Sequence, residues 1–139
     1  MFISSTSDGT IYTTDVSGGP GSERIAVARK IDGECKSLEM LGPPVNGDTQ
    51  SMYPFVAPHG SYLVFNSRRP NEKVKSVLMV SFKTQDGGWS EPRLIDLGGE
   101  AGTPFVSRDG KFLSFTSGEK GKSDIYWVSA EVIKALRPE

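Results

Sequence analysis

Apolar and polar residues alternate along three short stretches of the chain, and each stretch follows a turn that contains glycine. The shared pattern covers residues 7–12, 58–63 and 108–113, with Gly9, Gly60 and Gly110 in the turns. Alternation with a period of two predicts β-strands with one buried face. A repeat of about fifty residues is typical of solenoids and propellers. The pattern therefore predicts three copies of one structural unit.

Short strands, named A to D in chain order, are expected in each unit, separated by turns rich in glycine and proline. In the first unit, residues 1–50, they are predicted at 2–6, 10–15, 24–31 and 36–41. In the second, residues 51–100, they are predicted at 52–57, 62–67, 76–83 and 89–97. The third, residues 101–139, repeats strands A to C at 103–107, 112–117 and 124–129.

The alternation stops after residue 129, where the fourth strand of the third unit would begin. Ser129 is a good N-cap, and Glu131 lies in the first turn of a possible helix. Val132, Ile133 and Leu136 form one apolar stripe at helical spacing. We predict a short terminal helix that lies against the last sheet and covers its edge, because a free edge strand promotes aggregation.

Four-stranded antiparallel units of this length are typical of β-propeller blades. We predict an all-β fold in which residues 1–139 form one domain of three four-stranded blades and a C-terminal helix. Blades turned by about 60° each, as in a six-bladed ring, turn the chain by about 180° in total. A two-fold axis would then complete the ring, so a homodimer is expected. Aromatic residues of the inner strands should pack between blades, namely Tyr12, Phe65, Phe115, Tyr126 and Trp127.

The composition argues against several functions. The 16 basic and 17 acidic residues give a net charge of −1, so neither a nucleic-acid partner nor a membrane partner is expected. Cys35 is the only cysteine and His59 the only histidine, so we expect no disulfide, no metal and no cofactor. No apolar run is long enough for a membrane helix. Residues 1–8 lack the features of a secretion signal, so the chain as written is expected to stay in the cytoplasm.

Aspartate precedes glycine in two of the three turns. Asp8 and Asp109 are expected to accept hydrogen bonds from backbone two residues further on, a structural role. His59 takes the corresponding position in the second turn, so a serine–histidine–aspartate triad would depend on an exposed turn, and we expect none. Cys35 has no basic flank that would activate it, so we expect a packed or inactive thiol.

The sequence resembles the PD40 family of WD40-like, TolB-type propeller repeats. The resemblance rests on residues 53–68, 89–92, 109–117 and 123–128, and residues 41–46 are similar to a linker between blades. Residues 124–138 look like the C-terminus of exported members, so the chain resembles the C-terminal half of such a protein. The chain departs from the family in having His59 in place of an aspartate, three blades rather than about six, and no secretion signal.

The resemblance implies an interaction platform, so the expected function is a non-catalytic binding module for a protein, peptide or carbohydrate. One alternative is a glycan hydrolase, which would need two carboxylates close together near the channel. The predicted A strands hold neither Asp nor Glu, which argues against that alternative. The other alternative is a folded remnant of a longer propeller without activity.

Any ligand is expected at the channel opening, where segments enter strand A and join strand B to strand C. The candidate ligand-binding residues are Tyr53, Asn66, Arg68, Arg69, Thr103 and Asp124. Arg68 and Arg69 are adjacent, and paired guanidinium groups suit carboxylate or phosphate; the alternative is two solvated loop charges. Asp124 with Arg68 would either face a ligand or tie two blades together. No catalytic residue is expected.

Overall fold

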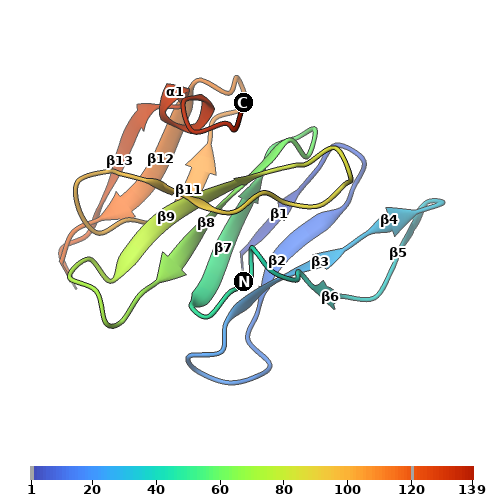
Figure 1. Cartoon of the computed structure of the whole chain (residues 1–139), viewed down its shortest axis with the longest axis horizontal. Coiled ribbons are helices and arrows are strands. Elements are labelled where there is room, and N and C mark those ends of the chain that lie inside the picture. Colours follow the sequence, from blue (N-terminus) through green and yellow to red (C-terminus); the bar gives the residue numbers. More distant parts are fainter. Residues whose placement is uncertain (1, 120) are drawn as a thin grey trace.

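The computed structural model describes residues 2–119 and 121–139. Its strands form three larger antiparallel sheets that follow one another around an arc, and a separate two-stranded hairpin (Figure 1). The first sheet has the order β1 (Ile3–Ser5), β2 (Ile11–Asp15), β3 (Arg24–Ala28) and β6 (Glu39–Met40). The second contains β7 (Gln50–Val56), β8 (Tyr62–Arg68), β9 (Ser76–Phe82) and β10 (Arg93–Ile95) in chain order. The third contains β11 (Gly102–Val106), β12 (Phe112–Ser117) and β13 (Asp124–Ser129).

The first two sheets have the four strands predicted for them, but the third sheet has three strands in the described part of the chain. The prediction of strands A to C followed by a helix is confirmed for the third unit, whereas its description as a four-stranded blade is wrong. The predicted strand 24–31 is also interrupted, because β3 ends at Ala28 and a separate hairpin follows. This hairpin pairs β4 (Lys30–Ile31) with β5 (Glu34–Cys35), and it leaves Cys35 exposed rather than packed.

Two apolar cores lie between the sheets, and the second sheet contributes one face to each of them. Leu63, Phe65 and Met79 face the first sheet, where the core also contains Tyr12 and Ile25. The opposite face of the second sheet packs against the third sheet and helix α1 (Glu131–Lys134). That second core contains Val64, Leu78, Val80, Phe82, Leu113, Phe115 and Ile133. Burial on both faces explains the continuous apolar runs at residues 62–65 of β8 and 77–80 of β9.

The first turn is one residue shorter than the other two, which changes the predicted alignment of the first sheet. The hydrogen bond that closes the first turn runs from the Thr6 amide to the Thr10 carbonyl. The corresponding amide-to-carbonyl bonds run from Ala57 to Tyr62 and from Ser107 to Phe112. Thr10 therefore corresponds to Tyr62 and Phe112. As a result Tyr12 matches Val64 rather than Leu63, and both Tyr12 and Val64 face the next sheet along the chain.

Strands β7 and β11 contain the same irregularity. Each has one extra residue relative to its partner strand, between Met52 and Phe55 in β7 and between Gly102 and Phe105 in β11. Tyr53 and Thr103 have φ of 51° and 43°, a left-handed conformation that is uncommon for residues other than glycine. Each is followed by a fully buried proline. The repeated bulge directs Tyr53 toward the space where a ligand was expected.

Two of the five aromatic residues expected in the core are exposed. Tyr12, Phe65 and Phe115 are buried as predicted. Tyr126 and Trp127 are exposed, with 68% of Trp127 accessible. Both lie on β13, and in the described part of the chain no further sheet packs beyond it. The prediction fails for Trp127 because its burial requires a further sheet. Tyr126 is on the other side, stacked on Phe115, and is exposed because it lies on the outer strand of the sheet.

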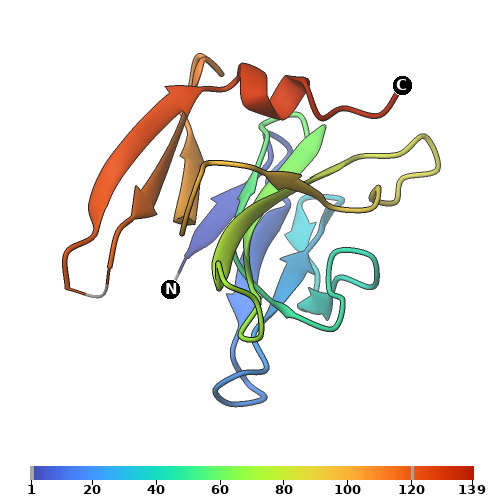
Figure 2. The ribbon, with the colours of Figure 1, turned by 60° about the vertical axis from the view of Figure 1, so that its left-hand side comes forward.

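Helix α1 occupies the predicted region but covers a different part of the molecule. Ile133 is buried in the core between the second and third sheets, and Val132 and Leu136 pack against it, as the apolar stripe predicted. The N-cap position is Ala130 rather than Ser129, but the Ser129 hydroxyl accepts a hydrogen bond from the Glu131 amide at 3.3 Å. Figure 2 shows the chain running from the end of β13 through α1 toward the second sheet, where Arg93 donates a hydrogen bond to the Leu136 carbonyl at 3.0 Å. The helix therefore closes the core between sheets and leaves the outer edge of β13 uncovered.

Asp8 and Asp109 have the structural role predicted from their turns. Asp8 accepts a hydrogen bond from the Thr10 amide at 2.9 Å, and Asp109 accepts one from the Lys111 amide at 3.0 Å. The hydroxyls of Thr6 and Ser107 donate to the same two carboxylates. These hydroxyl bonds, and then the backbone bonds, lower the pKa of both aspartates. The second turn lacks both partners, with Ala57 and His59 in their places.

Asp109→Ala is expected to lower the melting temperature at pH 7, and the difference from wild type should shrink in acid. A carboxylate with a lowered pKa stabilises the fold above its unfolded pKa, and this contribution is lost as the pH falls through the folded pKa. Thermal denaturation between pH 7 and about pH 2 would measure the trend. His59→Ala, at the matching position of the second turn, should show no such loss. An equal destabilisation by Asp109→Ala at every pH would contradict the role of the charge.

Candidate functional site

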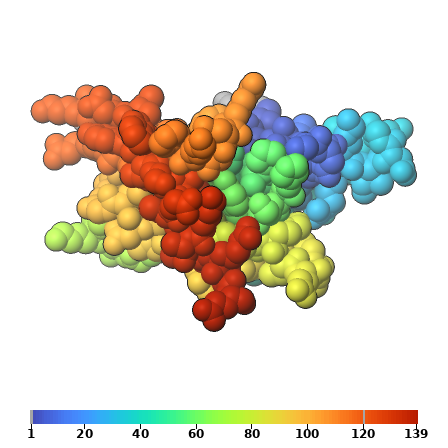
Figure 3. All heavy atoms as spheres, turned by 90° about the horizontal axis from the view of Figure 1, so that it is seen from above, coloured from blue at the N-terminus to red at the C-terminus, as the bar shows by residue number. Residues whose placement is uncertain are grey.

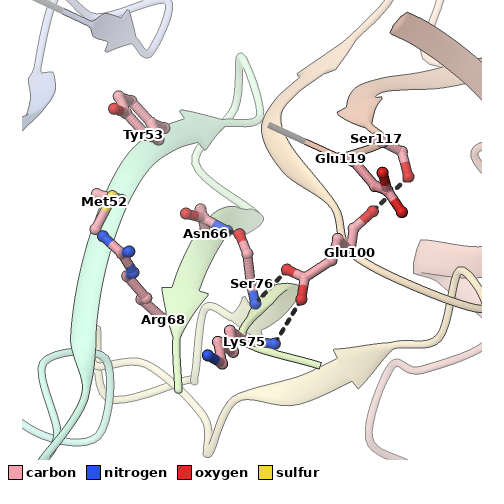
Figure 4. A pocket seen from close by; sticks show the side chains of 10 residues that line it. Met52, Tyr53, Asn66, Arg68, Lys75, Ser76, Glu100, Ser117 and Glu119 are labelled. Atoms are coloured by element: carbon pink, nitrogen blue, oxygen red, sulfur yellow. Dashed lines mark hydrogen bonds between the residues drawn. The ribbon is translucent and has the colours of Figure 1, made fainter. Parts of the chain in front are cut away.

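A pocket of about 710 Å³ opens between the second and third sheets, at the end where strands β7 and β11 begin (Figure 4). Met52 and Tyr53 of β7 form one wall, and Asn66 and Arg68 come from β8. The opposite side is formed by residues of the connection into β11 and the end of β12. These are Glu100, Ser117, Gly118 and Glu119, with Lys75 and Ser76 lying between the two walls.

Asn66 is the most buried polar group of the pocket, with 4% of its surface accessible. Its amide nitrogen donates to the Ser76 hydroxyl at 2.8 Å, the Val77 carbonyl at 3.1 Å and the Ala101 carbonyl at 3.0 Å. The side-chain hydrogen bonds of Asn66 to the described residues all come from this nitrogen. The amide oxygen keeps contact with solvent and points toward the wall formed by Met52 and Tyr53 (Figure 4). The nitrogen therefore holds the two sheets together, while the oxygen remains available as a fixed acceptor.

The two adjacent arginines lie in different cavities. Arg68 lines the pocket, and no ion pair joins its guanidinium to the described residues. Arg69 lines a separate small cavity beside Met79, and it pairs with Glu72 at 3.4 Å. Successive residues at the end of a strand point to opposite faces, which separates these side chains. The two guanidinium groups therefore do not face one pocket, and the prediction that they act as a pair is wrong.

Glu100 fixes the connection between the sheets instead of presenting a free carboxylate. Its two oxygens accept hydrogen bonds from the backbone amides of Lys75 and Ser76, at 2.8 and 2.7 Å. Its own carbonyl accepts a bond from the Ser117 hydroxyl at 2.5 Å. These three bonds tie the ends of β9, β11 and β12 together around the pocket. The pocket is thus bounded by backbone that is held in one arrangement.

Tyr53 and Thr103 occupy matching positions in their strands but have different surroundings. The ring of Tyr53 is partly exposed, lines the pocket and packs edge-on against Phe2 at 5.9 Å between ring centres. Its backbone amide donates to the Thr14 hydroxyl of the first sheet at 2.9 Å. The Thr103 hydroxyl is bonded to the Thr116 hydroxyl of its own sheet at 2.7 Å. Tyr53 is therefore the one of the two that presents its side chain to the pocket.

Asp124 lies at the start of the outer strand β13 and is exposed. Within the described residues no ion pair joins it to Arg68, so the predicted tie between the two is absent. The structure brings together three of the six candidates, Tyr53, Asn66 and Arg68, around one pocket. The residues that sequence reasoning missed lie on the facing side, foremost Glu100. Its position just before strand A of the third unit was the available signal.

The lining of the pocket contains two carboxylates, which have different surroundings. Of its two carboxylates, Glu100 is committed to backbone amides, and Glu119 lies on the exposed rim. Across residues 2–119 and 121–139 no group of three or more His, Cys, Asp or Glu side chains is placed to hold a metal ion. The described part of the chain also contains no helix with the length and hydropathy of a membrane span. The pocket can offer the amide oxygen of Asn66 as an acceptor, the guanidinium of Arg68, the ammonium of Lys75, the ring of Tyr53 and, on its rim, the carboxylate of Glu119.

Comparison with solved structures places the arc of sheets within a known fold. The crystal structure of TolB from Acinetobacter baumannii resembles this chain with a TM-score of 0.62 at 17% sequence identity. The match covers 93% of this chain and 29% of the TolB chain. No protein-family model matches the chain, and no curated protein sequence matches it. The predicted membership of the PD40 repeat family therefore stays a prediction. The chain has the fold of part of the TolB propeller.

Proposed function

We propose that the chain is a non-catalytic binding module that holds an acidic peptide segment of a partner protein in the pocket between the second and third sheets. The observation that carries the proposal is the pairing of an almost buried Asn66, whose amide oxygen has no donor among the described residues, with the unpaired guanidinium of Arg68. A guanidinium binds a carboxylate through two parallel hydrogen bonds. A backbone amide of the same peptide would donate to Asn66.

The charges around the pocket favour an anionic group over a cationic one. Arg68 and Lys75 are cationic, and Glu119 is the one carboxylate of the lining that is not bonded to backbone amides. The exposed ring of Tyr53 adds a rigid surface on which an apolar or amide group of the peptide can rest. The commitment of Glu100 to backbone argues against glycan hydrolysis, which needs a carboxyl group free to transfer a proton.

Replacing Arg68 by alanine is expected to weaken peptide binding about tenfold or more, because a hydrogen bond to a charged group contributes about 1.5–3 kcal/mol. The probe is an array of synthetic peptides that differ in the number and position of aspartate and glutamate. Peptides retained by the wild-type chain would then be titrated calorimetrically against the wild type and Arg68→Ala.

Arg69→Ala is the matched control, because it removes the same group from the adjacent residue, whose side chain lies in another cavity. Its affinity should stay within about twofold of wild type, which is less than 0.5 kcal/mol. Equal losses in the two variants, or retention of peptides regardless of their acidic residues, would contradict the proposal. Binding on a glycan array with no retention on the peptide array would replace the peptide by a carbohydrate ligand.

A further inference from the structure

The third sheet leaves an apolar face uncovered, and this face has a buried counterpart in the second sheet. Cross-strand pairing places Phe105, Phe112, Ile125 and Trp127 on one side of the third sheet, which we term its open face. All four are exposed, Ile125 to 78%. The equivalent positions of the second sheet hold, in the same order, Phe55, Tyr62, Leu78 and Val80. These four residues pack against the third sheet. The open face therefore has the position of a surface that packs on another sheet.

The first sheet leaves uncovered the face that, in the second and third sheets, packs against the preceding sheet. Its open face contains Ser5, Ile11 and Thr13, with the exposed side chains of Ile3 and Met40 on the same side. In the second and third sheets the matching positions of Ser5, Ile11 and Thr13 hold buried residues that pack against the preceding sheet. These are Val56, Leu63 and Phe65 in the second sheet, and Val106, Leu113 and Phe115 in the third.

Side-chain sizes on the two open faces are complementary. On the third sheet Trp127 stands where the first and second sheets have Val27 and Val80. On the first sheet Thr13 stands where the second and third sheets have Phe65 and Phe115. A larger residue on one face and a smaller one on the other keep the total volume of such a contact close to that inside the chain. Closely packed cores tolerate exchanges of residues best when the total side-chain volume stays the same.

We propose that the open face of the third sheet packs on the open face of the first sheet of a second copy, and that two such contacts close a homodimeric ring. The two open faces lie toward opposite ends of the arc, with the first sheet and its hairpin at one end and the third sheet at the other (Figure 3). One copy therefore cannot join its own faces. A two-fold axis makes both contacts at once and leaves no open face on either copy.

Light scattering coupled to size exclusion at micromolar concentration tests the proposal. The wild-type chain is expected at twice its mass of 15.1 kDa. Trp127→Glu should reduce the mass to that of one chain, because the glutamate places a charge in the contact. Thr13→Arg, on the other face, should have the same effect. Leu94→Glu, at an exposed leucine of the second sheet, is the control and should leave the dimer intact.

Circular dichroism of each variant should match wild type, since Trp127 and Thr13 are on uncovered faces. A wild-type chain of single mass would overturn the proposal, as would masses that grow beyond two chains. A dimer that survives Thr13→Arg but not Trp127→Glu would overturn it too, because the third sheet would then pack on its own copy.

Discussion

Leu78→Ala is expected to lower the free energy of unfolding by about 2–5 kcal/mol, the range for removing a large aliphatic side chain from a closed core. Leu78 is fully buried on β9, in the core that the second sheet shares with the third sheet and α1. The substitution leaves a cavity lined by side chains of three separate elements, which cannot all move in to fill it. Urea denaturation followed by circular dichroism would measure the change.

Leu94→Ala is the matched control, because Leu94 is on the neighbouring strand β10 of the same sheet but is 42% exposed. Its removal is expected to cost less than about 1 kcal/mol. The comparison separates burial between sheets from the general loss of a leucine. Equal effects of the two variants would mean that the second and third sheets do not pack as described.

The glycine turns and the alternation predicted the strands well, because both are local properties of the chain. They did not reveal that the first turn lacks one residue, since a strand pattern with a period of two looks the same when it is displaced by one position. The displacement decides which face of β2 meets the next sheet. It places Tyr12 in the core between the first and second sheets and leaves Ile11 on the other side.

Burial on the last sheet could not be predicted from the inner-strand position of its aromatic residues. Tyr126 and Trp127 have the same strand environment as the buried Met79 and Val80 of the second sheet. Coverage of Trp127 depends on a further sheet, and coverage of Tyr126, on the side of Phe115, depends on how far the second sheet reaches over the outer strand. The local pattern records neither. The helix was predicted from its apolar stripe, but its location over the core between two sheets depends on tertiary contacts of Ile133.

The candidate site was predicted only in part, because tertiary contacts decide which of its residues come together. The expected position, where segments enter strand A and join strand B to strand C, is where the pocket lies, and it brings Tyr53, Asn66 and Arg68 together. The adjacency of Arg68 and Arg69 suggested a joint role, although neighbouring residues of a strand point to opposite faces. Glu100 lies just before strand A of the third unit, which marks its location, but the bonds from the Lys75 and Ser76 amides to its carboxylate are contacts between sheets that this location does not reveal.

Asn66→Asp is expected to destabilise the chain at pH 7 by about 3–5 kcal/mol, the range for an uncompensated buried charge. The substitution keeps the shape of the side chain but replaces the amide nitrogen, which donates to Ser76, Val77 and Ala101, by an oxygen. A carboxylate would then face two backbone carbonyl oxygens inside the protein. Asn66→Ala, which removes the donor without adding charge, should cost less, about 1–3 kcal/mol.

The pH dependence distinguishes the charge from a simple loss of packing. Burial against carbonyl oxygens should raise the folded pKa of the introduced aspartate above its unfolded value. Stability relative to wild type is then best below the unfolded pKa and is lost as the pH rises through the folded pKa. Urea denaturation at pH 4 to 7 should therefore show a difference that widens with pH, a range chosen from the usual aspartate pKa of about 4. Asn71→Asp, on the exposed loop after β8, should show no comparable trend, and a pH-independent loss in Asn66→Asp would contradict the bonding described for Asn66.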